Sequence, residues 1–172
     1  MYQKSNSILK KNINLIILII SGILLRLYDY NSEDLWFDEL LSFWVSDPNI
    51  SFFETFNRNS DVNAGGIVFA YILKLFFFIF GYNADIARIS TVIFGVISLL
   101  CLVILTNKLK IKNILILLIF LFGFNSYLIS YDHELRFYSS IVFLSILNFI
   151  FFENLVKKKR NLDFLLISII NL

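Results

Sequence analysis

Two short acidic motifs lie at the ends of apolar stretches, and they hold the side chains best suited to do chemistry. The first motif, Leu35–Leu40, contains Asp38 and Glu39, and the second motif is Tyr131–Tyr138. A carboxylate beside hydrocarbon is costly, so in an apolar chain it marks a functional site by default. A carboxylate can also take the proton from an attacking hydroxyl group. The two motifs can form one site only if the elements around them place both on the same side of a membrane.

The composition indicates an integral membrane protein. The chain has 172 residues, of which 58% are hydrophobic and 17% aromatic, and its mean hydropathy is +0.77. A soluble domain is closer to half apolar. With their flanking aromatic residues, four apolar runs approach the ~20 residues that span a bilayer: Ile13–Leu27, Ile89–Leu105, Ile114–Ile129 and Phe137–Phe152. We therefore expect an all-α, polytopic membrane helical bundle. The lone Cys101 excludes an intrachain disulfide.

The basic residues predict the topology. They form three clusters, which the positive-inside rule places in the cytoplasm: Lys4 with Lys10 and Lys11, Lys108 with Lys110 and Lys112, and Lys157–Arg160. The segment 28–63 has eight acidic residues and only Arg58 as a base. We expect a bacterial cytoplasmic membrane, a cytoplasmic N-terminus and an external acidic loop.

One apolar stretch would upset this topology if it crossed the membrane. Gly66–Phe80 is short, follows a second glycine and carries Lys74 in its middle. These features favour an interfacial or re-entrant helix over a span. Without that span, all basic clusters lie inside and both acidic motifs face outward.

The resulting plan is a single domain with an incomplete set of spans. The apolar run over 162–172 ends without a cap or flanking charge, so we expect a fragment of a longer protein. The plan has spans at about 12–29, 88–105, 113–130 and 137–153, a further span beginning at 162–172, and an external loop with interfacial helices over about 30–87.

The external loop is rich in aromatic residues, including Trp36 and Trp44. Leu35–Val45 predicts a short amphipathic helix at the membrane surface, with its rings at the level of the headgroups. Such a helix would hold Asp38 and Glu39 near a lipid-borne substrate. Alternatively, the two carboxylates only solvate the polar face of a surface helix.

The second motif also has two interpretations. Asp132 and Arg136 are spaced i,i+4, so they could pair on an exposed helix start. At helical spacing Glu134 shares a face with Tyr131 and Tyr138, and a carboxylate between two phenols is typical of a polar pocket.

The order of these motifs resembles a known family over residues 8–160. A Trp-x-Asp-Glu sequence (36–39) precedes an interfacial helix, Arg88–Gly95 opens the next helix, and a Tyr-x-x-Glu-x-Arg-x-Tyr sequence follows at 131–138. This pattern resembles the GT-C type membrane glycosyltransferases, in their protein-mannosyltransferase-like and aminoarabinose-transferase-like branch. Many relatives have His-Pro-Pro-Leu where this chain has Asp61–Ile67; there, Asn63 could bind substrate through a hydrogen bond but supply no proton.

The resemblance implies sugar transfer from a polyprenyl-phosphate donor to a lipid, glycan or protein acceptor outside the membrane. In that reading Asp38 is the catalytic base and Glu39 supports it. Arg88 and Arg136 would bind the leaving phosphate, since guanidinium groups bind phosphate in a bidentate manner.

The remaining site residues predicted from the resemblance contact the substrate. Glu134 would anchor Arg136 or bind a sugar hydroxyl, and Trp36, Trp44 and Tyr138 offer ring faces for a sugar or a prenyl chain. Tyr131 is a further substrate-binding candidate. No cofactor is required, although a divalent metal between Asp38 and Glu134 is an open alternative. We expect no nucleic-acid partner.

A non-catalytic membrane protein remains the alternative: a transporter segment, a scaffold or an inactive truncated product. A transporter would place ionisable residues near the middle of the membrane. Here they gather at the predicted outer boundary, and only Lys74 would lie deeper.

Overall fold

The computed structural model describes the backbone of residues 2–62, 66–111, 114–158 and 161–170 and the side chains over 13–62, 66–111, 114–157 and 162–170. All regular elements in these ranges are helices, which confirms the prediction of an all-α chain. They are α1 (Tyr2–Leu27), α2 (Phe37–Val45), α3 (Phe52–Val62), α4 (Ile67–Phe80), α5 (Ala84–Lys108), α6 (Leu115–Gly123), α7 (Ser126–His133), α8 (Tyr138–Lys158) and α9 (Asn161–Ile170). Asn63 lies outside the described residues.

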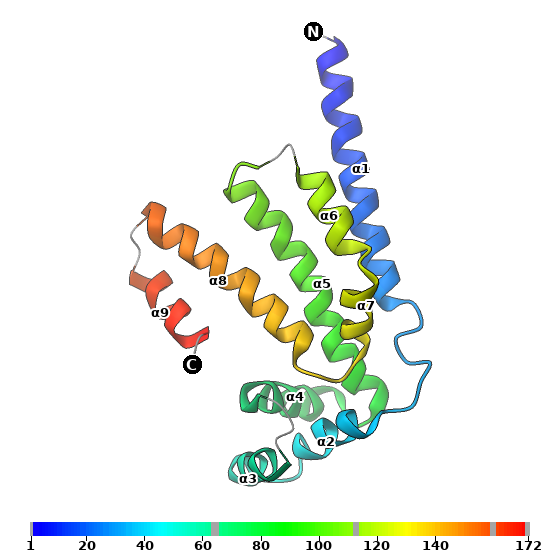
Figure 1. Cartoon of the computed structure of the whole chain (residues 1–172), viewed down its shortest axis with the longest axis vertical. Coiled ribbons are helices and arrows are strands. Elements are labelled where there is room, and N and C mark those ends of the chain that lie inside the picture. Colours follow the sequence, from blue (N-terminus) through cyan, green and yellow to red (C-terminus); the bar gives the residue numbers. More distant parts are fainter. Residues whose placement is uncertain (1, 63–65, 112–113, 159–160, 171–172) are drawn as a thin grey trace.

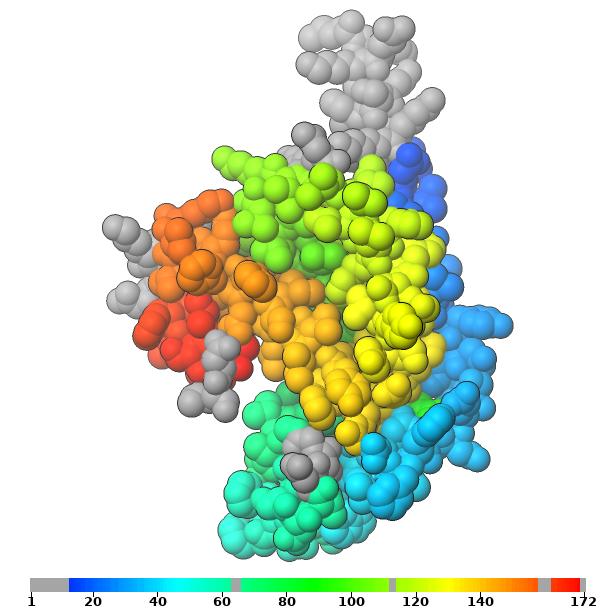
Figure 2. Space-filling model, viewed as in Figure 1, coloured from blue at the N-terminus to red at the C-terminus, as the bar shows by residue number. Residues whose placement is uncertain are grey.

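The helices form a bundle with a cap across one end. α5 is central and packs against α1, α6, α7 and α8 (Figure 1). The cap consists of α2, α3 and α4, whose axes run across the lower end of the bundle rather than along it (Figure 1). In the space-filling view the cap forms the cyan and green layer below the bundle (Figure 2).

Two of the described helices, α5 and α8, are long and apolar enough to cross a membrane. α6 and α7 provide a third span if this bent pair counts as one. Ile13–Leu27, the part of α1 whose side chains are described, and the whole of α4 are shorter apolar helices. The predicted span over 12–29 stays a prediction. α4 is short and lies in the cap, and its interfacial or re-entrant placement stays a prediction.

The predicted span over 113–130 corresponds to two helices with a bend between them rather than to one straight helix. α6 ends at Gly123, α7 begins at Ser126, and the two axes differ by 50°. Glycine is a poor helix former, and Asn125 starts a new helix because its side chain accepts a hydrogen bond from the Leu128 N–H at 3.1 Å.

The cap is joined to the bundle by an apolar core. Phe69, Leu73 and Phe77 of α4 pack with Ala87 of α5 and with Leu135, which precedes α8. Leu135 belongs to the second acidic motif, so this core fixes that motif against the cap.

The buried Lys74 ties α4 to the chain that follows α2. Its ammonium group donates to the carbonyl of Ile50 at 2.6 Å and to that of Asp47. Two backbone carbonyl oxygens of the cap thus accept hydrogen bonds from the Lys74 ammonium group, so this side chain has a structural role.

The basic helix ends meet at the opposite end of the bundle from the cap (Figure 1). Lys157 of α8 donates to the Lys108 carbonyl at the end of α5 at 3.1 Å, and Glu153 forms ion pairs with both lysines. Two of the predicted cytoplasmic clusters therefore share one end. Which end faces the cytoplasm stays a prediction.

Candidate functional site

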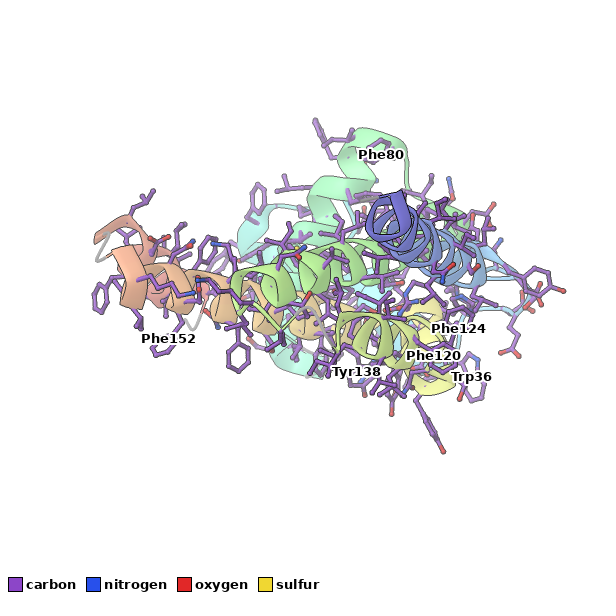
Figure 3. All side chains as sticks on the ribbon, turned by 90° about the horizontal axis from the view of Figure 1, so that it is seen from above. Trp36, Phe80, Phe120, Phe124, Tyr138 and Phe152 are labelled. Carbon is purple, nitrogen blue, oxygen red and sulfur yellow. The ribbon has the colours of Figure 1, made fainter. Side chains whose placement is uncertain are left out.

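A cavity of about 610 Å³ lies where the cap meets the turn between α7 and α8. Both acidic motifs line it, although almost one hundred residues separate them. The predicted site residues in its wall are Trp36, Asp38, Glu39, Arg88, Glu134, Arg136 and Tyr138. Tyr131 lies beside Tyr138, with ring centroids 5.0 Å apart. Figure 3 shows Trp36 and Tyr138 on the same side of the molecule.

Glu39 is a buried connector between the cap and the bundle. Its side chain is 2% exposed and pairs with Arg88 of α5, with 2.8 Å between Oε2 and Nη2. Its carboxylate also accepts the backbone N–H of Leu135 at 2.6 Å and that of Trp36 at 2.9 Å. The Trp36 contact is one half of a capping box, because Glu39 is the third residue of α2. These contacts occupy both oxygens of Glu39 and join the cap to the bundle.

Arg88 has a partner for each of its three guanidinium nitrogens. Besides Glu39, it donates to the carbonyl of Asp34 at 2.9 Å and to that of Glu33. Its side chain is 3% exposed. In this structure Arg88 therefore holds the loop before α2 against α5, and the binding of phosphate by Arg88, predicted from the resemblance, would require these bonds to break.

Asp38 and Arg136 form a charged pair in the wall of the cavity. Oδ2 of Asp38 lies 3.5 Å from Nη1 of Arg136, and the Asp38 side chain is 66% exposed. The Arg136 side chain is 18% exposed and its Nη1 also donates to the Asp38 carbonyl at 3.4 Å, so the exposed member of this pair is the Asp38 carboxylate. The Arg136 guanidinium lies 5.9 Å from the ring centroids of Phe137 and Tyr138.

Glu134 presents a half-buried carboxyl group. Among the described residues, this carboxyl group has no hydrogen-bond or ion-pair partner. Burial raises its pKa, the Glu39 charge raises it further, and Arg136 opposes both effects. Such a carboxyl group can donate or accept a hydrogen bond, which suits a sugar hydroxyl.

A buried ion pair that the sequence analysis missed fixes the second motif. Arg26 of α1 is fully buried, and its Nε lies 2.8 Å from Oδ2 of Asp132 in α7. Its Nη atoms donate to the carbonyls of Gly123 at 3.0 Å and Phe122 at 3.2 Å, the last two residues of α6. Carbonyl groups at a helix end lack a partner within the helix. Arg26 therefore supplies hydrogen bonds to the two carbonyl groups at the end of α6, where the chain breaks before α7. One signal was available: Arg26 is an ionisable residue inside an apolar run.

The predicted i,i+4 pair of Asp132 with Arg136 is wrong. α7 ends at His133 and Glu134 is extended, with φ −87° and ψ 134°, so Asp132 and Arg136 do not share a helix face. Glu134 does not share one with Tyr131 and Tyr138 either. Asp132 of α7 instead forms its ion pair with Arg26 of α1, and both lie next to α5.

Two further contacts hold the end of α7. The Thr91 hydroxyl on α5 donates to the Asp132 carbonyl at 2.8 Å, and Nε2 of His133 lies 2.9 Å from the Arg26 carbonyl oxygen. A β-carbon at Gly95 would overlap the Asp132 carboxylate, so glycine is required there.

The described side chains include no group of three His, Cys, Asp or Glu residues that could hold a metal ion. The alternative of a metal between Asp38 and Glu134 gains no support from this geometry.

Comparisons with models of protein families, with curated proteins and with solved structures found no match. The resemblance to GT-C type glycosyltransferases therefore rests on the motifs alone.

Proposed function

We propose that this chain takes part in the transfer of a sugar from a polyprenyl-phosphate donor to a hydroxyl acceptor at the outer face of a membrane. The observation that carries the proposal is the cavity at the capped end of the bundle. It combines an exposed carboxylate, Asp38, with a neighbouring guanidinium, Arg136, that is 18% exposed. General-base catalysis and stabilisation of a leaving phosphate require these two groups.

Asp38 is the base in this mechanism. It takes the proton from the acceptor hydroxyl while the hydroxyl oxygen attacks the anomeric carbon. The bond between that carbon and the phosphate oxygen breaks, and the electron pair leaves on the lipid phosphate. The neighbouring Arg136 stabilises the phosphate charge by charge-assisted hydrogen bonds.

The other lining residues suit a sugar between these two groups. Glu134 has no partner among the described residues and is free to bind a sugar hydroxyl. Trp36 is 68% exposed and offers an apolar ring face. Glu39 and Arg88 act indirectly, by fixing α2 and Leu135 around the cavity.

The distribution of charge supports an outward-facing cavity. Lys108 and Lys157 lie together at the end of the bundle opposite to the cap. Basic residues favour the cytoplasmic side, which leaves the cavity outside.

The test is a transfer assay in membranes from cells that produce the protein, with radiolabelled polyprenyl-phosphate hexoses and pentoses as donors. Asp38→Asn is expected to abolish transfer while the amount of inserted protein stays unchanged. Asp61→Asn is the matched control, because Asp61 is an exposed carboxylate on α3 away from the cavity. Near-normal transfer by Asp38→Asn would refute its assignment as the base, and absence of transfer by the unaltered protein with every donor would refute the proposed function.

A further inference from the structure

One titratable side chain in the wall of the cavity has no role in the proposed reaction. His133 is the only histidine of the chain, the last residue of α7, and half-buried. It lines the cavity together with Asp38 and Glu134. The two nitrogens of an imidazole ring differ in chemistry according to which of them carries the proton. The partners of these nitrogens therefore determine what the ring offers to the cavity.

One of the two nitrogens of His133 is bound to α1. Its Nε2 lies 2.9 Å from the carbonyl oxygen of Arg26. α1 ends at Leu27, and the last carbonyl groups of a helix lack a partner within it, so this oxygen is open to a donor from elsewhere. A carbonyl oxygen only accepts hydrogen bonds, so Nε2 carries the proton. In the neutral ring Nδ1 then has a lone pair and acts as an acceptor.

The other nitrogen is left for a ligand. Among the described residues no group forms a hydrogen bond with Nδ1, and this atom is not enclosed in the interior. Because His133 belongs to the cavity wall, an occupant of the cavity can reach Nδ1. The carboxyl group of the next residue, Glu134, also has no partner in the described part of the chain. Two consecutive residues thus offer hydrogen-bonding groups to the same cavity.

The imidazole ring has a rigid support. Arg26 is fully buried, and its guanidinium group binds Asp132 and the end of α6, so its carbonyl oxygen is a fixed acceptor. The backbone just before His133 is held as well, because the Asp132 carbonyl accepts a hydrogen bond from the Thr91 hydroxyl at 2.8 Å. A ring that is already fixed loses little freedom when a ligand binds, which favours binding.

The chemistry of Nδ1 indicates the ligand. An acceptor needs a donor, and a hydroxyl group can donate a hydrogen bond, whereas an ionised phosphate group only accepts. We propose that His133 is a substrate-binding residue whose Nδ1 accepts a hydrogen bond from a hydroxyl group of a sugar in the cavity. This inference rests on the proposed function and deepens it. Asp38 and Arg136 act on the reacting bond, whereas His133 contributes to the choice of sugar.

The experiment is ¹⁵N NMR of the full chain in detergent, with ¹⁵N in the histidine ring. Because the chain contains a single histidine, a protein prepared without a histidine tag gives signals from His133 alone. The spectra are recorded at about pH 8, where an ordinary imidazole is neutral. The probes are polyprenyl-phosphate hexoses and pentoses, methyl glycosides of the same sugars, and polyprenyl phosphate without a sugar.

We expect Nε2 to be protonated and Nδ1 to be unprotonated in the free protein. At least one sugar-bearing probe is expected to shift the Nδ1 signal saturably, while polyprenyl phosphate alone leaves it in place. A shift by the lipid-linked sugars places the donor sugar at His133, and a shift by the methyl glycosides places a sugar acceptor there. A protonated Nδ1, an Nδ1 signal that no sugar moves, or an equal shift by polyprenyl phosphate alone would overturn the proposal.

Two substitutions separate binding from structural support. His133→Gln places an amide at the position of Nε2, so it keeps a donor for the Arg26 carbonyl and loses the acceptor at Nδ1. His133→Asn places its amide nearer the backbone, at the position of Nδ1, and loses the reach to Arg26. In the transfer assay the Gln variant is expected to raise KM for the sugar by about three- to tenfold with kcat little changed.

The Asn variant is expected to keep KM within about twofold of the unaltered protein and to have a lower unfolding temperature, since it lacks the hydrogen bond to α1. Equal KM values for the Gln variant and the unaltered protein would contradict a binding role. A loss of activity that follows the unfolding temperature in both variants would reduce His133 to a structural residue.

The two proposals fail in different ways. A sugar-dependent shift of Nδ1 without transfer from any donor would contradict the proposed function and leave the assignment of His133 standing. Transfer by the unaltered protein without a shift of Nδ1 would contradict the assignment of His133 alone.

Discussion

The buried pair of Arg26 with Asp132 gives the sharpest prediction about stability. Arg26→Met deletes one charge of the pair and also the donors that bind the carbonyls of Phe122 and Gly123. Asp132 is then left as an unpaired carboxylate in the interior.

The size of the effect follows from this geometry. Removing one partner of a buried ion pair costs about 3–5 kcal/mol, because the remaining charge is uncompensated. In a chain of this size 1 kcal/mol corresponds to roughly 2–4 °C, so we expect the unfolding temperature to fall by about 6–20 °C. In the double variant Arg26→Met/Asp132→Leu no charge remains unpaired. Its loss is expected to be smaller than the sum of the two single losses by about 2 kcal/mol or more.

The lone Cys101 provides the assay. It is buried between α5 and α8, so a thiol-reactive fluorophore reports unfolding in detergent. The control is Arg58→Met, which removes an i,i+4 pair with the half-exposed Glu54 and two contacts with Trp44 but leaves no buried charge unpaired, so it is expected to cost less than Arg26→Met. An Arg26→Met protein that unfolds within about 1 kcal/mol of the unaltered chain would refute the reasoning, and so would strict additivity in the double variant.

Three further predictions use the same thermal assay. Gly95→Ala is expected to lose about 1–3 kcal/mol because the new methyl group would overlap a buried carboxylate, whereas Gly66→Ala has open space and is expected to be close to neutral; equal effects would contradict the packing argument. Burial raises the pKa of the Glu134 carboxyl above its ordinary value of 4.5, so the folded protein disfavours the charged form of this group. Glu134→Gln is therefore expected to raise the unfolding temperature at neutral pH, and this gain is expected to shrink as the pH falls through the raised pKa and to vanish below 4.5. A gain in unfolding temperature that does not depend on pH would contradict this prediction. Tyr82→Phe removes a hydrogen bond of 3.1 Å to the Phe43 carbonyl and is expected to cost about 1 kcal/mol, against which an unchanged unfolding temperature would count.

The apolar pattern predicted the helices well. Long runs such as Ile89–Leu105 became α5 because a helix satisfies its own backbone. Short length and a central lysine separated α4 from the long helices. The basic residues predicted that Asp38 and Glu134 lie on the same side of a membrane; both line one cavity, and the side stays a prediction.

The partners of the charged residues could not be predicted from the sequence. The i,i+4 spacing favoured Asp132 with Arg136, but α7 ends between them. The partner of Asp132 is Arg26, more than one hundred residues away in the sequence. Arg26 lies at the break between α6 and α7, which is marked in the sequence only by Gly123 and the capping residue Asn125. Arg88 was expected to meet a ligand, and its enclosure by Glu39 and two loop carbonyls becomes evident only once the cap is folded against α5.

The central claim is that the two acidic motifs form one site on the outer face of a membrane. The most direct test is crosslinking of an Asp38→Cys/Arg136→Cys pair in a Cys101→Ala background, with a short membrane-impermeant bifunctional thiosulfonate added to intact cells. The matched control is a Lys108→Cys/Lys157→Cys pair, whose parent residues touch at the opposite end of the bundle. The account predicts that the first pair links in intact cells and the control pair links only after permeabilisation. A first pair that never links would contradict the shared site, and a control pair that links in intact cells would contradict the outward orientation.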